Sequence, residues 1–147
     1  MKYIKKYESV NPNPRLDELK KLLIYLTNLF KELGYGHEKH YDETQYVNNF
    51  YNEEKNAKRS FDIDGEFSNS LIFLSVTMRI GSIDDELVEF IPDYLKTLDG
   101  LELYSENKDF YYTTFNVVDK VDNIIDQISI DDFKQKLQAK KFNIWNT

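Results

Sequence analysis

Apolar residues recur at steps of three and four after the first two prolines of the chain. They are Leu16, Leu19, Leu22, Leu23, Leu26, Phe30 and Leu33. This spacing is that of one continuous stripe along an amphipathic helix. Pro14 fits the first helical position with Asn13 as its N-cap, because that position needs no amide donor. Gly34 supplies a stop, so the pattern predicts a helix that ends there and buries Leu22 and Leu26.

The segment 35–59 is harder to interpret. Tyr46, Val47, Phe50 and Tyr51 are spaced as a short helical stripe, with Asp42 or Thr44 as the cap. The polar segment 52–58 that follows is typical of a loop. We therefore expect a short helix before residue 52 and no regular structure directly after it.

Two strands are predicted next. Apolar residues and Gly65 alternate with Asp62, Asp64 and Glu66 over 61–67, which indicates a half-buried strand with an acidic outer row. The triplet 68–70 is turn chemistry. The following strand, 71–80, has apolar residues on both faces of its first half and is therefore expected to be central.

The second half of the chain predicts helices around another hairpin. One helix carries Leu87, Ile91, Tyr94, Leu95 and Leu98. Ser82 or Asp84 would cap it, and it either kinks or divides at Pro92. Segments 101–105 and 110–118 predict a hairpin. Helices follow over 121–128 and from Ser129, where Asp132 completes a capping-box pattern.

The predicted fold class is α+β. We expect an antiparallel sheet of about four strands in two hairpins, packed with the N-terminal amphipathic helix, a middle helix and C-terminal helices. Residues 1–147 are expected to form a single domain, with 1–14 as a flexible arm or an edge strand.

Composition removes several classes of protein. The 147 residues contain no cysteine, which excludes disulfides, thiolate metal sites and cysteine nucleophiles. The longest apolar run, Leu22–Leu26, is too short to span a bilayer, and the basic start lacks the apolar region of a signal peptide. A cytoplasmic protein is expected. The abundance of Asn, Lys, Ile and Tyr beside only two alanines is typical of AT-rich codons, as in a low-GC bacterium, its phage or a plasmid.

The acidic residues are concentrated in the middle of the chain. The segment 61–109 holds 12 acidic and three basic residues, a net charge of −9, whereas the rest of the chain sums to +2. Acids at 84–86 are explained by the dipole of the helix that starts there, but Glu89, Asp93, Glu102 and Glu106 are not. A concentrated acidic face favours encounter with a basic partner.

No motif indicates catalysis. His37 and His40 with Asp42 and Glu43 offer metal-ligand types, but an exposed loop with two ordinary histidines is favoured. The carboxylates at 62, 64 and 66, about 7 Å apart in steps of two, could hold Mg²⁺ in a nuclease, but a solvated row is favoured because no lysine or further acid converges on them. Glycine-rich nucleotide loops and nucleophile elbows are lacking. No catalytic residue, metal or cofactor is predicted.

The leading hypothesis is a non-enzymatic acidic binding or inhibitor protein of a bacterial or phage conflict system. It would occlude a basic nucleic-acid-handling partner, a nuclease or toxin, as anti-CRISPR, anti-restriction and toxin immunity proteins do. Direct binding of nucleic acid or membrane is not expected. Alternatives are an acidic secretion chaperone or adaptor and a carboxylate-metal nuclease using Asp62 and Asp64. The expected partner-binding residues are Asp62, Asp64, Glu66, Glu86, Glu89, Asp93, Tyr104 and Tyr111; the tyrosine-rich segment 35–51 is the reserve candidate.

Overall fold

The computed structural model describes residues 14–42, 45–52, 58–79 and 85–146. The elements in chain order are α2 (Pro14–Glu32), β1 (Tyr35–Tyr41), β2 (Gln45–Asn52), β3 (Lys58–Ser68), β4 (Leu71–Met78), α3 (Glu86–Lys96), β5 (Leu101–Asn107), β6 (Tyr112–Val117), α4 (Val121–Ile125) and α5 (Ile130–Asn146). The strands form one antiparallel sheet of six, in the order β1-β2-β3-β4-β6-β5. The α+β class is confirmed, but four strands understates the sheet. Of the expected N-terminal arm 1–14, residues 1–13, including the expected N-cap Asn13, lie outside the described residues, and Pro14 begins α2.

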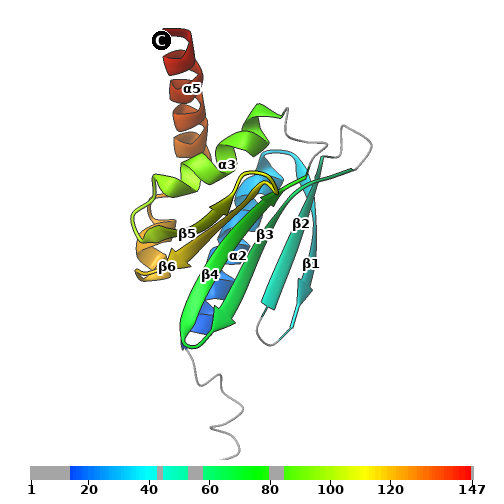
Figure 1. The fold of residues 1–147 in the computed structure, drawn as a ribbon, viewed down its shortest axis with the longest axis vertical. Helices are drawn as coiled ribbons and strands as arrows, with labels where there is room; N and C mark the ends of the chain where they lie inside the picture. The colour runs from blue at the N-terminus through cyan, green and yellow to red at the C-terminus, as the bar shows by residue number, and fades with distance from the viewer. Residues whose placement is uncertain (1–13, 43–44, 53–57, 80–84, 147) are drawn as a thin grey trace, which may run out of the picture.

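Helices α2 and α3 pack on one face of the sheet, and α5 packs against α3 and projects beyond the sheet in Figure 1. Helix α2 runs behind the strands in Figure 1, and the core lies between them. None of the labelled helices crosses the near face of the sheet in this view. We call this near face of the sheet the outer face. Among the described residues no helix is long and apolar enough to cross a membrane.

Helix α2 follows its sequence pattern. Leu22 and Leu26 are fully buried, and Gly34 ends the segment with a φ of +103° that favours glycine. The helix crosses β3 so closely that a Cβ at Gly65 would lie 2.8 Å from the side chain of Leu19. A glycine in the middle of a strand is therefore explained by close helix packing.

The predicted short helix at 46–51 is wrong, because these residues form β2. A period of two also fits the segment, with Tyr46, Asn48 and Phe50 directed inward and buried. Asn48 is tolerated there because its side-chain amide donates to the carbonyl of Ile63 at 3.1 Å. Asp42 does not cap a helix; it accepts from the amide of Gln45 at 2.8 Å and closes the β1–β2 turn. Thr44, the other expected cap, lies outside the described residues.

The remaining elements follow the predictions with local differences. Asp85 is the N-cap of α3 and accepts from the amide of Leu87 at 3.0 Å, whereas the expected caps Ser82 and Asp84 lie outside the described residues. The helix continues through Pro92, which is buried. At the start of α5 the hydroxyl of Ser129 accepts from the amide of Asp132 at 3.0 Å, as the capping pattern predicts. The β5–β6 hairpin forms as expected.

Candidate protein-binding face

The strand register arranges the side chains of the outer face in rows that cross β3, β4, β6 and β5 in turn. The rows are Glu66–Phe73–Asn116–Glu102, then Asp64–Ser75–Thr114–Ser105, then Asp62–Thr77–Tyr112–Asn107. Neighbouring strands are about 4.8 Å apart, so each row spans about 14 Å. Carboxylates therefore occupy the β3 side of this face, while hydroxyl and aromatic groups occupy its centre.

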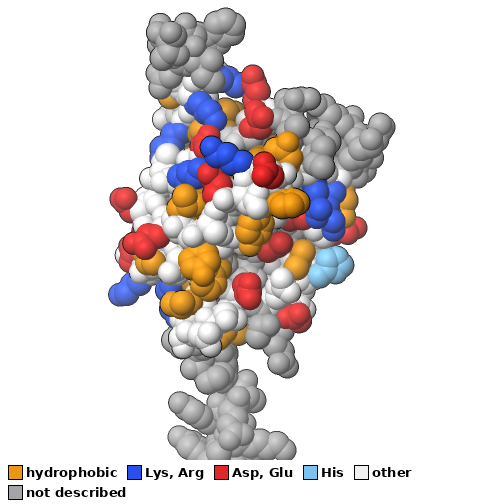
Figure 2. All heavy atoms as spheres, viewed as in Figure 1, with side chains coloured by type: hydrophobic (Ala, Val, Ile, Leu, Met, Phe, Trp, Pro, Cys, Tyr) orange, Lys and Arg blue, Asp and Glu red, His pale blue; other side chains and the backbone are white. Residues whose placement is uncertain are grey.

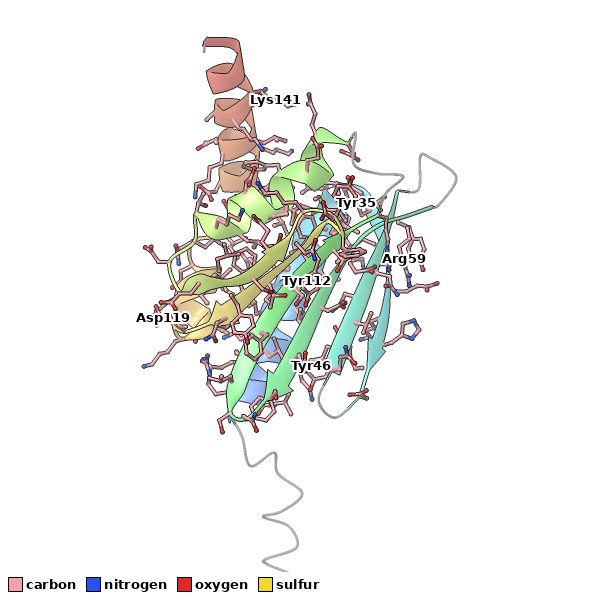
Figure 3. The ribbon with its side chains drawn as sticks, viewed as in Figure 1. Tyr35, Tyr46, Arg59, Tyr112, Asp119 and Lys141 are labelled. Carbon is pink, nitrogen blue, oxygen red and sulfur yellow. The ribbon has the colours of Figure 1, made fainter. Side chains whose placement is uncertain are left out.

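A groove with an aromatic floor lies over the last three strands. Phe73 and Tyr104 pack edge to face with their ring centroids 5.0 Å apart, and Leu71 and Tyr112 line the same groove of about 380 Å³. Tyr104 is 66% exposed, although its ring is held by Phe73. Hydrophobic side chains gather over this part of the outer face in Figure 2, and Tyr112 lies over the middle of the sheet in Figure 3. An exposed apolar patch of this kind is typical of an interaction site.

Hydroxyl groups hold the centre of the groove. The hydroxyl of Ser75 lies 3.0 Å from that of Thr114 and 3.3 Å from that of Tyr112, so the three side chains are linked. Beside them the side-chain oxygen of Asn116 is buried and, within the described residues, has no hydrogen-bond partner. The hydroxyl groups of the groove are thus linked to one another, and Asn116, which is not part of the groove lining, keeps one unsatisfied acceptor.

Of the acidic residues on the outer face, Glu66 lines the groove, and Asp64 and Glu102 stand next to its lining. Glu66 stands at one end of the first row and Glu102 at the other, while Asp64 lies opposite Ser75. Among the described residues none of the three carboxylates is in an ion pair, and neither lysine nor arginine lines the groove. Burial and, after it, the neighbouring carboxylate of Asp62 raise the pKa of Asp64 from 3.8 to about 6. The exposed Glu66 and Glu102 therefore make this part of the outer face negative, whereas Asp64 is partly buried and accepts from the backbone amide of Asn48 at 3.3 Å.

Asp62 differs from the rest of the predicted acidic row. Its side chain is buried and is ion-paired with Arg79 and, at 3.5 Å, with Arg59. Burial raises the pKa of this carboxyl, and the two guanidinium groups oppose the rise. Asp62 consequently anchors the ends of β3 and β4 and is not a solvated docking group. A carboxylate already held by two arginines is also poorly prepared to bind Mg²⁺.

The acidic side chains of α3 face another part of this chain. Asp93 is paired with Lys140 at 2.5 Å, and Glu86 with Lys141 at 2.8 Å; both lysines belong to α5. Their contribution to a docking surface is therefore reduced by lysines of the same chain. Sequence reasoning missed this because the two segments are 47 residues apart.

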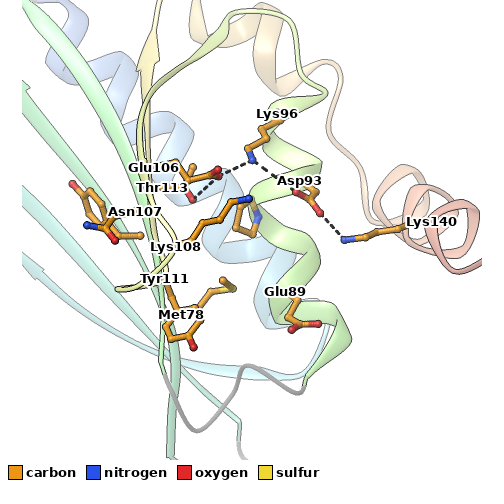
Figure 4. A pocket seen from close by; sticks show the side chains of 12 residues that line it. Met78, Glu89, Asp93, Lys96, Glu106, Asn107, Lys108, Tyr111, Thr113 and Lys140 are labelled. Carbon is orange, nitrogen blue, oxygen red and sulfur yellow. Dashed lines mark hydrogen bonds and ion pairs between the residues drawn. The ribbon is translucent and has the colours of Figure 1, made fainter. Parts of the chain in front are cut away.

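A pocket of about 420 Å³ separates α3 from the β5–β6 hairpin (Figure 4). Glu89 and Tyr111 line this pocket and not the outer groove. Lys96 closes one side of the pocket with an ion pair of 2.6 Å to Glu106. Tyr111 adopts a φ of +52°, and its carbonyl accepts from the amide of Met78 at 2.9 Å. The eight predicted partner-binding residues are thus divided among separate places; only Glu66 and Tyr104 line the groove, and Asp64 stands next to its lining, opposite Ser75.

The tyrosines of 35–51 do not form one exposed surface. Tyr35 and Tyr46 are buried in the core, and the hydroxyl of Tyr35 donates to Asp85 at 3.1 Å. His37 and His40 lie on strand β1 and not in a loop. His37 is paired with the inward-facing Phe50, so a step of three along the strand puts the two rings on opposite faces, unlike a shared metal site. No cluster of three potential metal ligands occurs in the described part of the chain.

Phe73 and Tyr112 line the groove and Glu102 stands at the end of the row that contains Phe73, but none of the three is among the eight expected partner-binding residues. Phe73 carried a signal, because it lies on the face of its strand opposite the core residues Ile72 and Leu74. The other two are brought to it by the pairing of β4 with β6, which joins strands that are not consecutive. No family model, curated protein or solved structure matches this chain. The geometry of its surfaces is therefore what a functional proposal has to rest on.

Proposed function

We propose that this chain is a non-enzymatic acidic binding protein that occludes a basic surface of a partner protein with the outer face of its sheet. The observation that carries the proposal is the groove itself. It combines an aromatic floor with the carboxylate of Glu66 in its lining and that of Glu102 at the other end of the same row of side chains. Among the described residues neither carboxylate is in an ion pair, and no lysine or arginine lines the groove.

An arginine side chain of the partner fits this combination. Its guanidinium plane packs on the face of an aromatic ring such as Tyr104, and its fork pairs with a carboxylate such as Glu66. Aromatic anchors surrounded by polar groups carry most of the binding energy in protein interfaces. The acids around the groove steer a basic partner toward it before contact is made.

A partner that handles nucleic acid is the class with the required surface. Such proteins contact phosphates through clusters of lysine and arginine, and an acidic protein seated on that cluster prevents access of nucleic acid. We place the chain in this role within a bacterial or phage conflict system, as an anti-CRISPR or anti-restriction protein or as a toxin immunity protein.

A secretion chaperone or adaptor is the second candidate, favoured by one observation. Strand β5 is an edge strand beside the groove, and all its residues after Leu101 are exposed. An extended segment of an effector could add to this edge and place alternate side chains in the groove. Binding of an isolated, unfolded segment of the partner would support the chaperone, whereas a requirement for the folded partner would support the occluding inhibitor.

The proposal is tested by affinity capture from the native host with the parent protein and two charge-matched variants. In one variant Glu66 and Glu102 are changed to Lys; in the other, the exposed Glu32 and Asp99, which do not line the groove, are changed to Lys. We expect the parent and the second variant to retain the same basic protein, and the first variant to lose it. Equal capture by both variants would contradict docking through the groove.

The nuclease alternative is tested separately. With Mg²⁺ or Mn²⁺ the purified protein is expected to leave DNA and RNA intact. Cleavage that disappears in Asp62→Asn would instead support a metal-dependent nuclease.

A further inference from the structure

A second groove, of opposite charge, lies between helix α2 and strand β1 on the helix side of the sheet. It measures about 360 Å³ and is lined by Lys31 of α2 and by His37, Lys39 and Tyr41 of β1, together with Thr27 and Asn28. None of its described lining residues is Asp or Glu. In a chain with a net charge of −7, this is a local concentration of positive charge and hydrogen-bond donors.

The side chains of His37 and Tyr41 in this groove are held in place by the buried Asn48. The amide nitrogen of Asn48 donates to the carbonyl of Ile63, so its side-chain oxygen is the acceptor that faces β1. The hydroxyl of Tyr41 donates to that oxygen at 3.0 Å, and Nε2 of His37 at 2.9 Å. Because Asn48 is completely buried, both groove side chains are fixed before a ligand binds.

Strand β1 is also an open edge. It is the first strand in the sheet order, and no described strand pairs with its outer side. His37 and Lys39 are two residues apart on one face of this strand, which separates them by about 7 Å along it. This distance equals the spacing of alternate side chains in an added extended strand.

We propose that this groove binds an acidic segment of a partner protein in extended conformation. The backbone of the segment pairs with the outer edge of β1, which no described strand covers, and its alternate carboxylates lie beside Lys39 and His37. The charge that holds them is supplied by Lys39 and by Lys31 of the helix, because the Nε2 hydrogen of His37 is already donated to Asn48. A lone oxyanion would engage only part of this arrangement. The site lies on the opposite side of the sheet from the outer face, so it is independent of the function proposed above.

The two histidines of the chain allow a direct test by NMR. The probe is a short peptide that alternates Thr and Glu, and its control is a peptide of the same composition with all Glu residues consecutive. We expect the alternating peptide to shift the ring signals of His37 much more than those of His40, which is exposed on the other face of β1. Absence of a shift at His37, or equal shifts by the two peptides or by inorganic phosphate at the same concentration, would overturn the proposal.

Variants then test whether the charges of Lys31 and Lys39 hold the acidic peptide. Changing Lys31 and Lys39 to Gln should weaken binding of the alternating peptide by about tenfold or more, whereas Lys134→Gln, an exposed position on α5, should not. Both variants keep the buried Asn48, and an unchanged amide spectrum would confirm that each is folded. Equal affinity of the Lys31/Lys39 variant and the parent for the alternating peptide would overturn the proposal. That result would not bear on the function proposed for the outer-face groove.

Discussion

Glu66 and Glu102 stand at opposite ends of one row across the outer face, with only Phe73 and Asn116 between them. The row joins β3 to β5, although 35 positions of the chain separate the two glutamates. Two like charges about 14 Å apart repel each other only weakly in salt, because the screening length is about 10 Å at 0.1 M. The fold therefore tolerates both charges, and a cation placed between them would be attracted by both.

The buried stripe of α2 gives a prediction for stability. Leu22→Ala and Leu26→Ala should each lower the free energy of unfolding by about 2–5 kcal/mol, because each removes a fully buried side chain and leaves a cavity. The control is Ile24→Ala on the exposed side of the same helix, where 54% of the residue is accessible. Denaturant titration should give a loss below about 1 kcal/mol for the control. Equal losses of stability at all three positions would contradict the burial of Leu22 and Leu26 in the core.

Asp64 gives a prediction for pH. Its folded-state pKa of about 6 lies above the ordinary value of 3.8, so the folded protein holds this proton more tightly than the unfolded chain does. Its contribution therefore favours the fold below about pH 4 and is lost as the pH rises through 6. Asp64→Asn should consequently stabilise the protein relative to the parent at pH 7 to 8, and the difference should disappear near pH 4.

The control for Asp64 is Glu66→Gln. Glu66 is exposed on the same strand, so its substitution should change stability little and without this pH dependence. Thermal unfolding of the three proteins between pH 4 and 8 is the measurement. A stability difference between Asp64→Asn and the parent that does not vary with pH would contradict the burial of this carboxyl.

The contact between α3 and α5 gives a third prediction. Changing Glu86, Glu89 and Asp93 together to Lys should lower the melting temperature, because Glu86 and Asp93 would become cations facing Lys141 and Lys140. Glu89→Lys alone should change it little. Adding Lys140→Glu and Lys141→Glu to the triple variant should restore part of the loss. No loss in the triple variant would show that the ion pairs do not hold α5 on α3.

The sequence alone predicts an element correctly where its hydrophobic residues fit one period and no other. Helix α2 has only one consistent interpretation, because its leucines fit a period of 3.6 and no other. Tyr46, Val47, Phe50 and Tyr51 fit a helical stripe, but Tyr46 and Phe50 also fit a strand when the intervening Asn48 is buried. What decides between them is the hydrogen bond from Asn48 to Ile63, a contact between two strands that a local pattern does not contain.

The candidate groove was predictable only in part, for a similar reason. The alternating acids of the strand 61–67 indicated Asp64 and Glu66, and the tyrosines of the second predicted hairpin indicated Tyr104. That Asp62 would be paired with Arg79 depends on the β3–β4 register, whereas its pairing with Arg59 is a contact between side chains of the same strand. The pairing of α3 acids with α5 lysines depends on how two distant helices pack, which charge counted along the chain does not reveal.

The most direct test of the binding role is the association rate of the captured partner with three proteins at low salt: the parent, the Glu66→Lys/Glu102→Lys variant and the Glu32→Lys/Asp99→Lys control. We predict that the Glu66→Lys/Glu102→Lys variant associates at least about tenfold more slowly than the parent. The control, which has the same change in net charge, should associate nearly as fast as the parent. The difference in association rate between the variant and the parent should shrink as salt is raised. If the groove variant associates as fast as the parent, the outer face is not the docking surface.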